Sequence, residues 1–109
     1  GMRVCLDVSH SKLACTHLSA SFSAFLKAIL PHTAHLHLAD AKGVDGEGLQ
    51  IHDGEIDWVQ LFALMDHLAP KASFIPEIWQ GHKNNGEGAW LALERLEGCV
   101  AATQDRQVA

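Results

Sequence analysis

Three short apolar segments, each followed by a longer polar or amphipathic stretch, constrain what this chain can fold into. The segments at residues 3–8, 34–39 and 73–78 are rich in leucine, valine, isoleucine or phenylalanine, and their lengths are typical of buried strands. Strands that alternate with helices favour a parallel sheet with right-handed crossovers. The order βαβαβα over 109 residues therefore predicts a single α/β domain.

Helices are predicted over residues 19–30, 57–69 and 85–97, because apolar side chains recur there three and four positions apart. Residues that commonly cap helix N-termini precede the three apolar faces, namely Ser19 or Ser21, Asp57 and Asn85. Residues that commonly end helices follow them, namely Pro31, Pro70 and Gly98.

Three polar stretches are predicted as loops, at residues 9–18, 40–54 and 80–88, and the first has room for one helical turn. The middle loop contains four glycines and four acidic residues, and its length is more typical of a functional loop than of a simple connection. Residues 1–98 are expected to form the βαβαβα domain. Residues 99–109 show no apolar period, so we expect a C-terminal tail that frays.

Charge and cysteine usage argue against several classes of protein. Eight Lys and Arg against 13 Asp and Glu give a formal net charge of −5, whereas nucleic-acid-binding proteins carry a basic face. No apolar run approaches the roughly 18 residues of a membrane span. The three cysteines fit a reduced chain better than a disulfide framework. We therefore expect a cytoplasmic protein without a nucleic-acid or membrane partner.

Carboxylates and imidazoles stand at or after the end of each predicted strand. Asp7 and His10 belong to the first strand end, His37 and Asp40 to the second, and Glu77 to the third. In parallel α/β folds, ligands bind beyond the carboxyl ends of the strands. Carboxylate oxygen and imidazole nitrogen together suit divalent transition metals. The residues therefore predict a divalent-metal site at this end of the sheet.

Several of these residues also have a structural interpretation. An aspartate at a strand end often caps a helix or forms a turn, which applies to Asp7. His35 and His37 point to one face of their strand and could be buried core histidines. An unpaired buried carboxylate is costly, so a metal partner is favoured for Glu77. The histidines expected on the surface are His17, His32 and His67.

Four motifs connect the chain to a known family. They are Cys-Leu-Asp-Val-Ser-His at 5–10, His-Leu-His-Leu-Ala-Asp-Ala-Lys at 35–42, Gly-Glu-Ile-Asp-Trp at 54–58 and Ile-Pro-Glu-Ile-Trp at 75–79. In this order and spacing, residues 3–97 resemble the C-terminal half of the xylose-isomerase-like TIM-barrel superfamily. That superfamily includes sugar phosphate isomerases and epimerases and the family 2 type of AP-endonuclease.

The resemblance implies a divalent metal (Mn, Zn, Co or Mg) with the ligands Asp7, His37 and Glu77. The expected contacts to a small sugar or sugar-phosphate substrate are His10, Lys42 and His82. Glu77 would also be the catalytic acid/base residue. The implied reaction removes a proton from the carbon next to a carbonyl, through an enediolate that the metal stabilises.

The chain is short for this family. A complete (β/α)₈ barrel takes about 250 residues, and these 109 residues resemble the fifth, sixth and seventh of its eight βα units. The glutamate that the family takes from its fourth strand is absent. We therefore expect a fragment of a metal-dependent sugar (phosphate) isomerase or epimerase that is weak or inactive alone. Because an open sheet exposes its edges, we also expect a homodimer or higher homo-oligomer that completes the partial barrel.

Two other functions stay open from the sequence alone. The chain could be a non-catalytic half-barrel module that binds a sugar or a partner. An AP-endonuclease-like phosphodiesterase is less favoured, because phosphate binding uses Lys and Arg and this chain is acidic.

Overall fold

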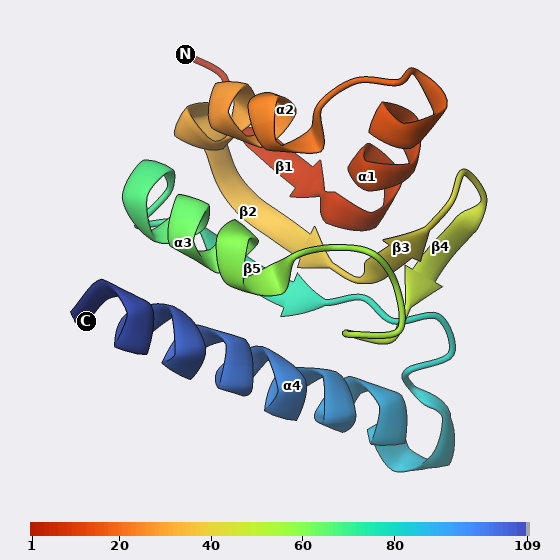
Figure 1. The fold of residues 1–109 in the computed structure, drawn as a ribbon. Helices are drawn as coiled ribbons and strands as arrows, with labels where there is room; N and C mark the ends of the chain where they lie inside the picture. The colour runs from red at the N-terminus through yellow and green to blue at the C-terminus, as the bar shows by residue number, and fades with distance from the viewer. Residues whose placement is uncertain (109) are drawn as a thin grey trace.

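The computed structural model describes residues 1–108 and shows an alternation of strands and helices (Figure 1). Its elements are β1 (Val4–Asp7), α1 (Val8–His17), α2 (Phe22–Ile29), the 3₁₀ turn η1 (Leu30–His32), β2 (Thr33–Leu38), β3 (Asp40–Lys42), β4 (Gly46–Leu49), α3 (Trp58–Leu68), β5 (Ser73–Pro76) and α4 (Lys83–Val108). No helix within the described residues is long and apolar enough to cross a membrane.

The three predicted strands form one parallel sheet in the order β1-β2-β5. Asp7 pairs with His37 across β1 and β2, and the register continues to β5, which ends at Pro76. Because β5 is an edge strand and Pro76 is its last residue, the missing amide proton of the proline breaks no ladder hydrogen bond.

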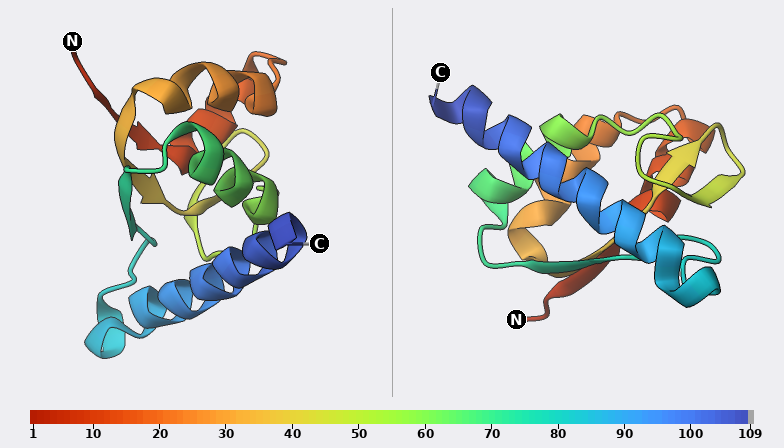
Figure 2. Two further views of the ribbon diagram at one scale, coloured as in Figure 1. Left: turned by 90° about the vertical axis from the view of Figure 1, so that its left-hand side faces the viewer. Right: turned by 90° about the horizontal axis from the view of Figure 1, so that it is seen from below.

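Helices cover one face of this sheet, and the other face is open. Leu6, Leu36 and Leu38 are buried in the core that the sheet shares with the helices. Figure 2 shows α2, α3 and α4 on the same side of the strands. The alternate positions His35 and His37 are only half-buried, because no element within residues 1–108 packs on that face. An open face of this kind is consistent with the predicted partial barrel, and the described strands do not close into a barrel.

The predicted caps of α2 and α3 hold their positions. The Ser21 side chain accepts a hydrogen bond from the amide of Ala24 at 3.0 Å, so Ser21 rather than Ser19 starts α2. The Asp57 carboxylate accepts from the amide of Gln60 at 3.0 Å at the start of α3.

The prediction of a loop at residues 9–18 was wrong, because α1 occupies most of that stretch. Its inward side chains are few, with Val8, Leu13 and Cys15 buried among polar neighbours, so no amphipathic period is visible in the sequence. The Asp7 carboxylate caps the helix by accepting from the amide of His10 at 2.9 Å. Capping and tertiary packing therefore make this helix, rather than an apolar stripe.

The predicted loop at residues 40–54 contains an antiparallel hairpin formed by β3 and β4. Figure 1 shows this hairpin beyond the arrowheads of β1 and β2. The two strands have three and four residues, which is too short for an alternating pattern to stand out in the sequence.

The third helix does not end at Gly98, and residues 99–108 are not a separate tail. Helix α4 continues to Val108, while Ala109 lies outside the described residues. Cys99 and Thr103 are buried, and the Thr103 hydroxyl donates to the carbonyl oxygen of Cys99 at 2.8 Å. Leu96, Cys99 and Thr103 are spaced by three and four residues, but this period is weak in the sequence because one member is polar.

The start of this helix also differs from the prediction. Asn85 is not an N-cap but lies in a left-handed turn, because Asn84, Asn85 and Gly86 all have positive φ angles of 54°, 61° and 83°. Asparagine and glycine tolerate this conformation better than other residues.

Candidate functional site

A cleft of about 420 Å³ opens at the carboxyl ends of the three parallel strands. Its lining comes from the ends of β1 and β2, the start of α1, strand β4 and the segment after β5. The lining residues are Asp7, Ser9, His10, His37, Ala39, Glu47, Gly48, Glu77, Ile78, Trp79 and Gln80.

The cleft brings together the three residues that were predicted as metal ligands. One ligand atom each of Asp7, His37 and Glu77 lies within 4.8 Å of the other two. Asp7 and His37 are paired across neighbouring strands. The amide of Glu77 donates to the carbonyl oxygen of Leu38 at 2.9 Å, which carries the sheet register one residue past β5. Parallel pairing therefore places all three side chains at one edge.

The closest contact in this cluster joins the imidazole of His37 to Glu77. Nδ1 of His37 lies 2.6 Å from Oε2 of Glu77. On its other side, Nε2 of His37 lies 3.8 Å from the thiol sulfur of Cys5. The His37 side chain is about one-third exposed and that of Glu77 is 58% exposed, so both are open to solvent in the cleft.

Asp7 has a structural role as well as a place in the cluster. Its Oδ1 accepts the α1 capping hydrogen bond and also lies 3.0 Å from Nδ1 of His10. A carboxylate has two oxygens with several acceptor sites, so capping and binding of a cation are compatible. The capping interpretation of Asp7 is therefore confirmed, and its role as a metal ligand stays a prediction.

His10 lies between two carboxylates. Its Nδ1 contacts Asp7, and its Nε2 contacts Oε2 of Glu47 on β4. Sequence reasoning placed His10 at the site but missed Glu47. The available signal was an acidic residue between two glycines in a loop of unusual length, which does not by itself identify a partner for His10.

These contacts change the protonation of His10. The hydrogen bond with Glu47 raises the pKa of His10 above its ordinary value of 6.5, partial burial opposes the shift, and the charge of Asp7 adds to the rise. The protonated form of His10 therefore persists to higher pH than that of a free imidazole.

Replacing Glu47 with glutamine should lower the pKa of His10 toward 6.5 in the metal-free protein. Because the folded pKa is raised, protonated His10 stabilises the fold below pH 6.5, and this contribution is lost as pH rises through the folded pKa. NMR titration of the His10 ring measures the shift. Glu94→Gln, on an exposed position of α4, is the matched control and should leave the titration unchanged. An equal pKa in wild type and Glu47→Gln would contradict the assignment.

The hairpin that carries Glu47 is fixed from two sides. The Ser9 hydroxyl donates to the carbonyl oxygen of Asp40 at 2.9 Å and accepts from the amide of Gly48 at 3.0 Å. The amide of Trp79 donates to the carbonyl oxygen of Gly48 at 2.9 Å. The hairpin thus connects α1 with the segment that follows Glu77.

Asp40, expected at the strand end with His37, does not line the cleft. Its side chain is fully buried and accepts hydrogen bonds from three backbone amides and from the indole of Trp58. This carboxylate therefore has a structural role.

Lys42 and His82, predicted as substrate contacts, are not brought to the cleft. Lys42 is exposed at the end of β3, and His82 is exposed in the turn before the regular part of α4. Neither side chain lines the cleft. The histidines predicted on the surface, His17, His32 and His67, are exposed.

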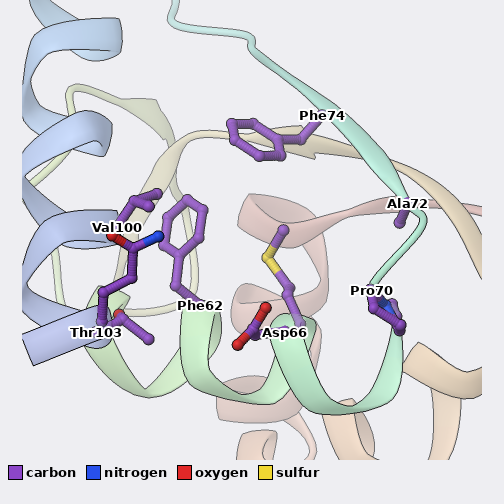
Figure 3. Close-up of a pocket in the computed structure, with 10 residues that line it drawn as sticks. Phe62, Asp66, Pro70, Ala72, Phe74, Val100 and Thr103 are labelled. Atoms are coloured by element: carbon purple, nitrogen blue, oxygen red, sulfur yellow. The ribbon is translucent and has the colours of Figure 1, made fainter. Parts of the chain in front are cut away.

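A second cavity, of about 180 Å³, lies between α3, α4 and β5 (Figure 3). Its wall is mostly apolar, and the rings of Phe62 and Phe74 meet edge to face with centroids 5.4 Å apart. Among the lining residues that the structure describes, Asp66 is the only acidic or basic one, and none is a histidine or cysteine. These described residues therefore form no second cluster of metal ligands.

A family model described as xylose isomerase-like TIM barrel matches residues 1–98, which include every residue that lines the cleft. No curated protein matches the chain.

Proposed function

The chain belongs to the xylose isomerase-like TIM barrel family, and on that premise we propose that it carries the metal-binding part of a sugar or sugar-phosphate isomerase or epimerase site. The observation that carries the proposal is the convergence of Asp7, His37 and Glu77 within 4.8 Å at the carboxyl ends of three parallel strands. Ligand sites of parallel α/β folds form at this end.

The residues present fit a divalent cation. Two carboxylates and one imidazole provide three protein ligands, the number typical of catalytic metal sites, which keep further positions for water or substrate. With Glu47, the cleft contains three carboxylates and two imidazoles. A bound cation would offset the repulsion between the negatively charged carboxylates. This donor set suits Mn, Zn, Co or Mg. Such an ion, when bound, supplies Lewis-acid polarisation of a carbonyl oxygen.

The side chains of the cleft have complementary tasks in this proposal. Glu77 is the general base, because its carboxylate is exposed in the cleft and can hold a proton taken from the substrate. His10 contacts Asp7 through Nδ1 and Glu47 through Nε2, so in this proposal it binds a substrate oxygen by exchanging one of these contacts for a hydrogen bond to the substrate.

We expect weak or no turnover by these 109 residues alone. Three strands build only part of a barrel mouth, and isomerisation needs one group to remove a proton and another to return it. Association of copies stays a prediction. The two edge strands available for it are β1 and β5.

Glu77→Gln and Asp7→Asn should each weaken binding of Mn²⁺ or Zn²⁺ by about tenfold or more, because each removes a charged ligand. Asparagine also caps helices well, so Asp7→Asn keeps α1 capped. Isothermal titration calorimetry gives the dissociation constants. In wild type, metal at 100 times its dissociation constant should add about 2.7 kcal/mol to the free energy of unfolding.

Glu94→Gln is the control for charge, since Glu94 is exposed on α4 away from the cleft. It should bind metal like the wild type. Absence of binding in the wild type would refute the proposed site. Equal affinities in all four proteins would show that the metal binds at other groups, for example at exposed histidines.

A further inference from the structure

A thiol and two imidazoles lie side by side on the open face of the sheet. Cys5 on β1 pairs with His35 on β2, and His37 is the next residue of β2 that points to the same face. The Cys5 side chain is exposed, and both histidines are half-buried. A single exposed cysteine does not indicate a binding site, whereas a thiolate beside two imidazoles is a ligand set that Zn²⁺ uses in proteins.

The distance between Cys5 and His37 suits one tetrahedral metal ion. Sγ of Cys5 lies 3.8 Å from Nε2 of His37. Zinc lies about 2.3 Å from a sulfur ligand and about 2.0–2.1 Å from a nitrogen ligand, so two such ligands at a tetrahedral angle are about 3.6 Å apart. The two atoms therefore already have nearly the separation that a shared ion requires.

The second ring nitrogen of His37 contacts a carboxylate. Nδ1 of His37 lies 2.6 Å from Oε2 of Glu77, which favours the tautomer with its proton on Nδ1 and directs the lone pair of Nε2 toward the thiol. Histidines that bind metals commonly donate their other ring N–H to a carboxylate, and this contact fixes the ring and makes the ligand nitrogen more basic. Glu77 therefore orients His37 for an ion bound beside Cys5.

His35 is held in an equivalent way. Its Nδ1 lies 2.7 Å from the hydroxyl oxygen of Ser73 on β5, so Nε2 is the nitrogen available to a metal. The rings of His35 and His37 meet edge to face, with centroids 5.2 Å apart. Two imidazoles bound to one tetrahedral ion have centroids roughly 5 Å apart, because each centroid lies about 1 Å beyond its ligand nitrogen. The spacing of the two rings therefore also fits a shared ion.

We infer that Cys5, His35 and His37 form a second metal site, on the open face of the sheet, which takes a thiophilic divalent ion such as Zn²⁺. One thiolate and two imidazoles leave a fourth position for water. The Cys5 thiol gives its proton to solvent as the metal–sulfur bond forms. The inference goes beyond the proposed function, although both sites use His37. Because a neutral imidazole has a single nitrogen lone pair for a metal, ions at the two sites compete for this residue.

Cadmium is the probe for this site, because a Cd²⁺–thiolate bond absorbs in the ultraviolet and bonds to carboxylate or imidazole add no such band. Titration of the full chain with Cd²⁺ should produce a saturable thiolate band. Cys5→Ser should lose the band, whereas Cys15→Ala and Cys99→Ala, each of which replaces a buried cysteine, should keep it. His35→Ala should weaken Cd²⁺ binding by about tenfold or more, since even the hydrogen-bond partners of metal ligands contribute that much.

His32→Ala is the matched control for His35→Ala, because His32 is an exposed histidine in η1, just before β2. It should bind Cd²⁺ like the wild type, and circular dichroism checks that each variant is folded. The inference is overturned by the absence of a thiolate band in the wild type, by an unchanged band in Cys5→Ser, or by equal Cd²⁺ affinity in His35→Ala and the wild type.

Manganese titration of the same protein separates this inference from the proposed function, because Mn²⁺ favours oxygen ligands over thiolate. Mn²⁺ binding that Asp7→Asn weakens, without any Cd²⁺–thiolate band, overturns the inference and leaves the proposed function standing. A thiolate band that depends on Cys5 and persists in Asp7→Asn, without Mn²⁺ binding in the wild type, supports the inference and contradicts a metal site in the cleft.

Discussion

Asp40→Ala is expected to lower the free energy of unfolding by about 4 kcal/mol, because it leaves several buried donors without an acceptor. Oδ1 of Asp40 accepts from the amides of Ala41 at 2.8 Å and Ile56 at 3.1 Å. Oδ2 accepts from the amide of His52 at 3.0 Å and from the indole of Trp58 at 2.8 Å. Each hydrogen bond to a charged group contributes about 1.5–3 kcal/mol, and these contributions are not additive.

Urea denaturation followed by circular dichroism measures this loss. Asp40→Asn should lose about half as much, because its amide oxygen still accepts while its NH₂ group faces donors. Asp45→Ala, at an exposed position between β3 and β4, is the control and should stay within about 0.5 kcal/mol of wild type. If Asp40→Ala unfolds at the same urea concentration as wild type, the buried network does not stabilise the fold.

The Asp40 carboxylate also helps to position the residues that line the cleft. Asp40 ties the hairpin to the segment before α3 and to Trp58 at the start of that helix. The hairpin in turn carries Glu47 and Gly48 into the cleft. A variant at Asp40 that still folds should therefore also alter the environment of His10, which contacts Glu47.

The sequence predicts those parts of the fold in which buried apolar side chains recur at a regular spacing. Helices α2 and α3 bury one face each, so their apolar residues recur with a helical period and their caps are readable. Helix α1 depends on the Asp7 cap and on a few buried residues, which leave no period. The β3–β4 hairpin is fixed by Ser9, which lies more than 30 residues away in sequence.

The candidate site, like the fold, was predictable from the sequence only in part. Asp7, His37 and Glu77 were predictable because parallel strands bring their carboxyl ends to one edge, whatever the loops do. The separate roles of His37 and Asp40 were not, because only the path of the chain after β2 turns Asp40 into the interior. Glu47 reaches His10 through a hairpin whose position depends on tertiary contacts, so local sequence could not pair them.

Gly54→Ala is expected to destabilise the fold by about 3 kcal/mol through overpacking. A Cβ atom at this position would lie 2.4 Å from the carbonyl oxygen of Ala41 and 2.4 Å from Oδ1 of Asp40. Neither oxygen can move freely, because the first belongs to the β3 backbone and the second accepts hydrogen bonds inside the core. Thermal and urea denaturation should both show the loss.

Gly98→Ala provides a control with the opposite expected sign. A Cβ atom there meets no heavy atom within 4 Å, and Gly98 lies inside α4, so alanine should stabilise the fold by about 0.5–1 kcal/mol. Alanine would be unfavourable instead if a helix ended at Gly98 with a left-handed residue. Destabilisation by Gly98→Ala would therefore contradict a continuous helix beyond residue 98, whereas a neutral Gly54→Ala would contradict the tight packing around Asp40.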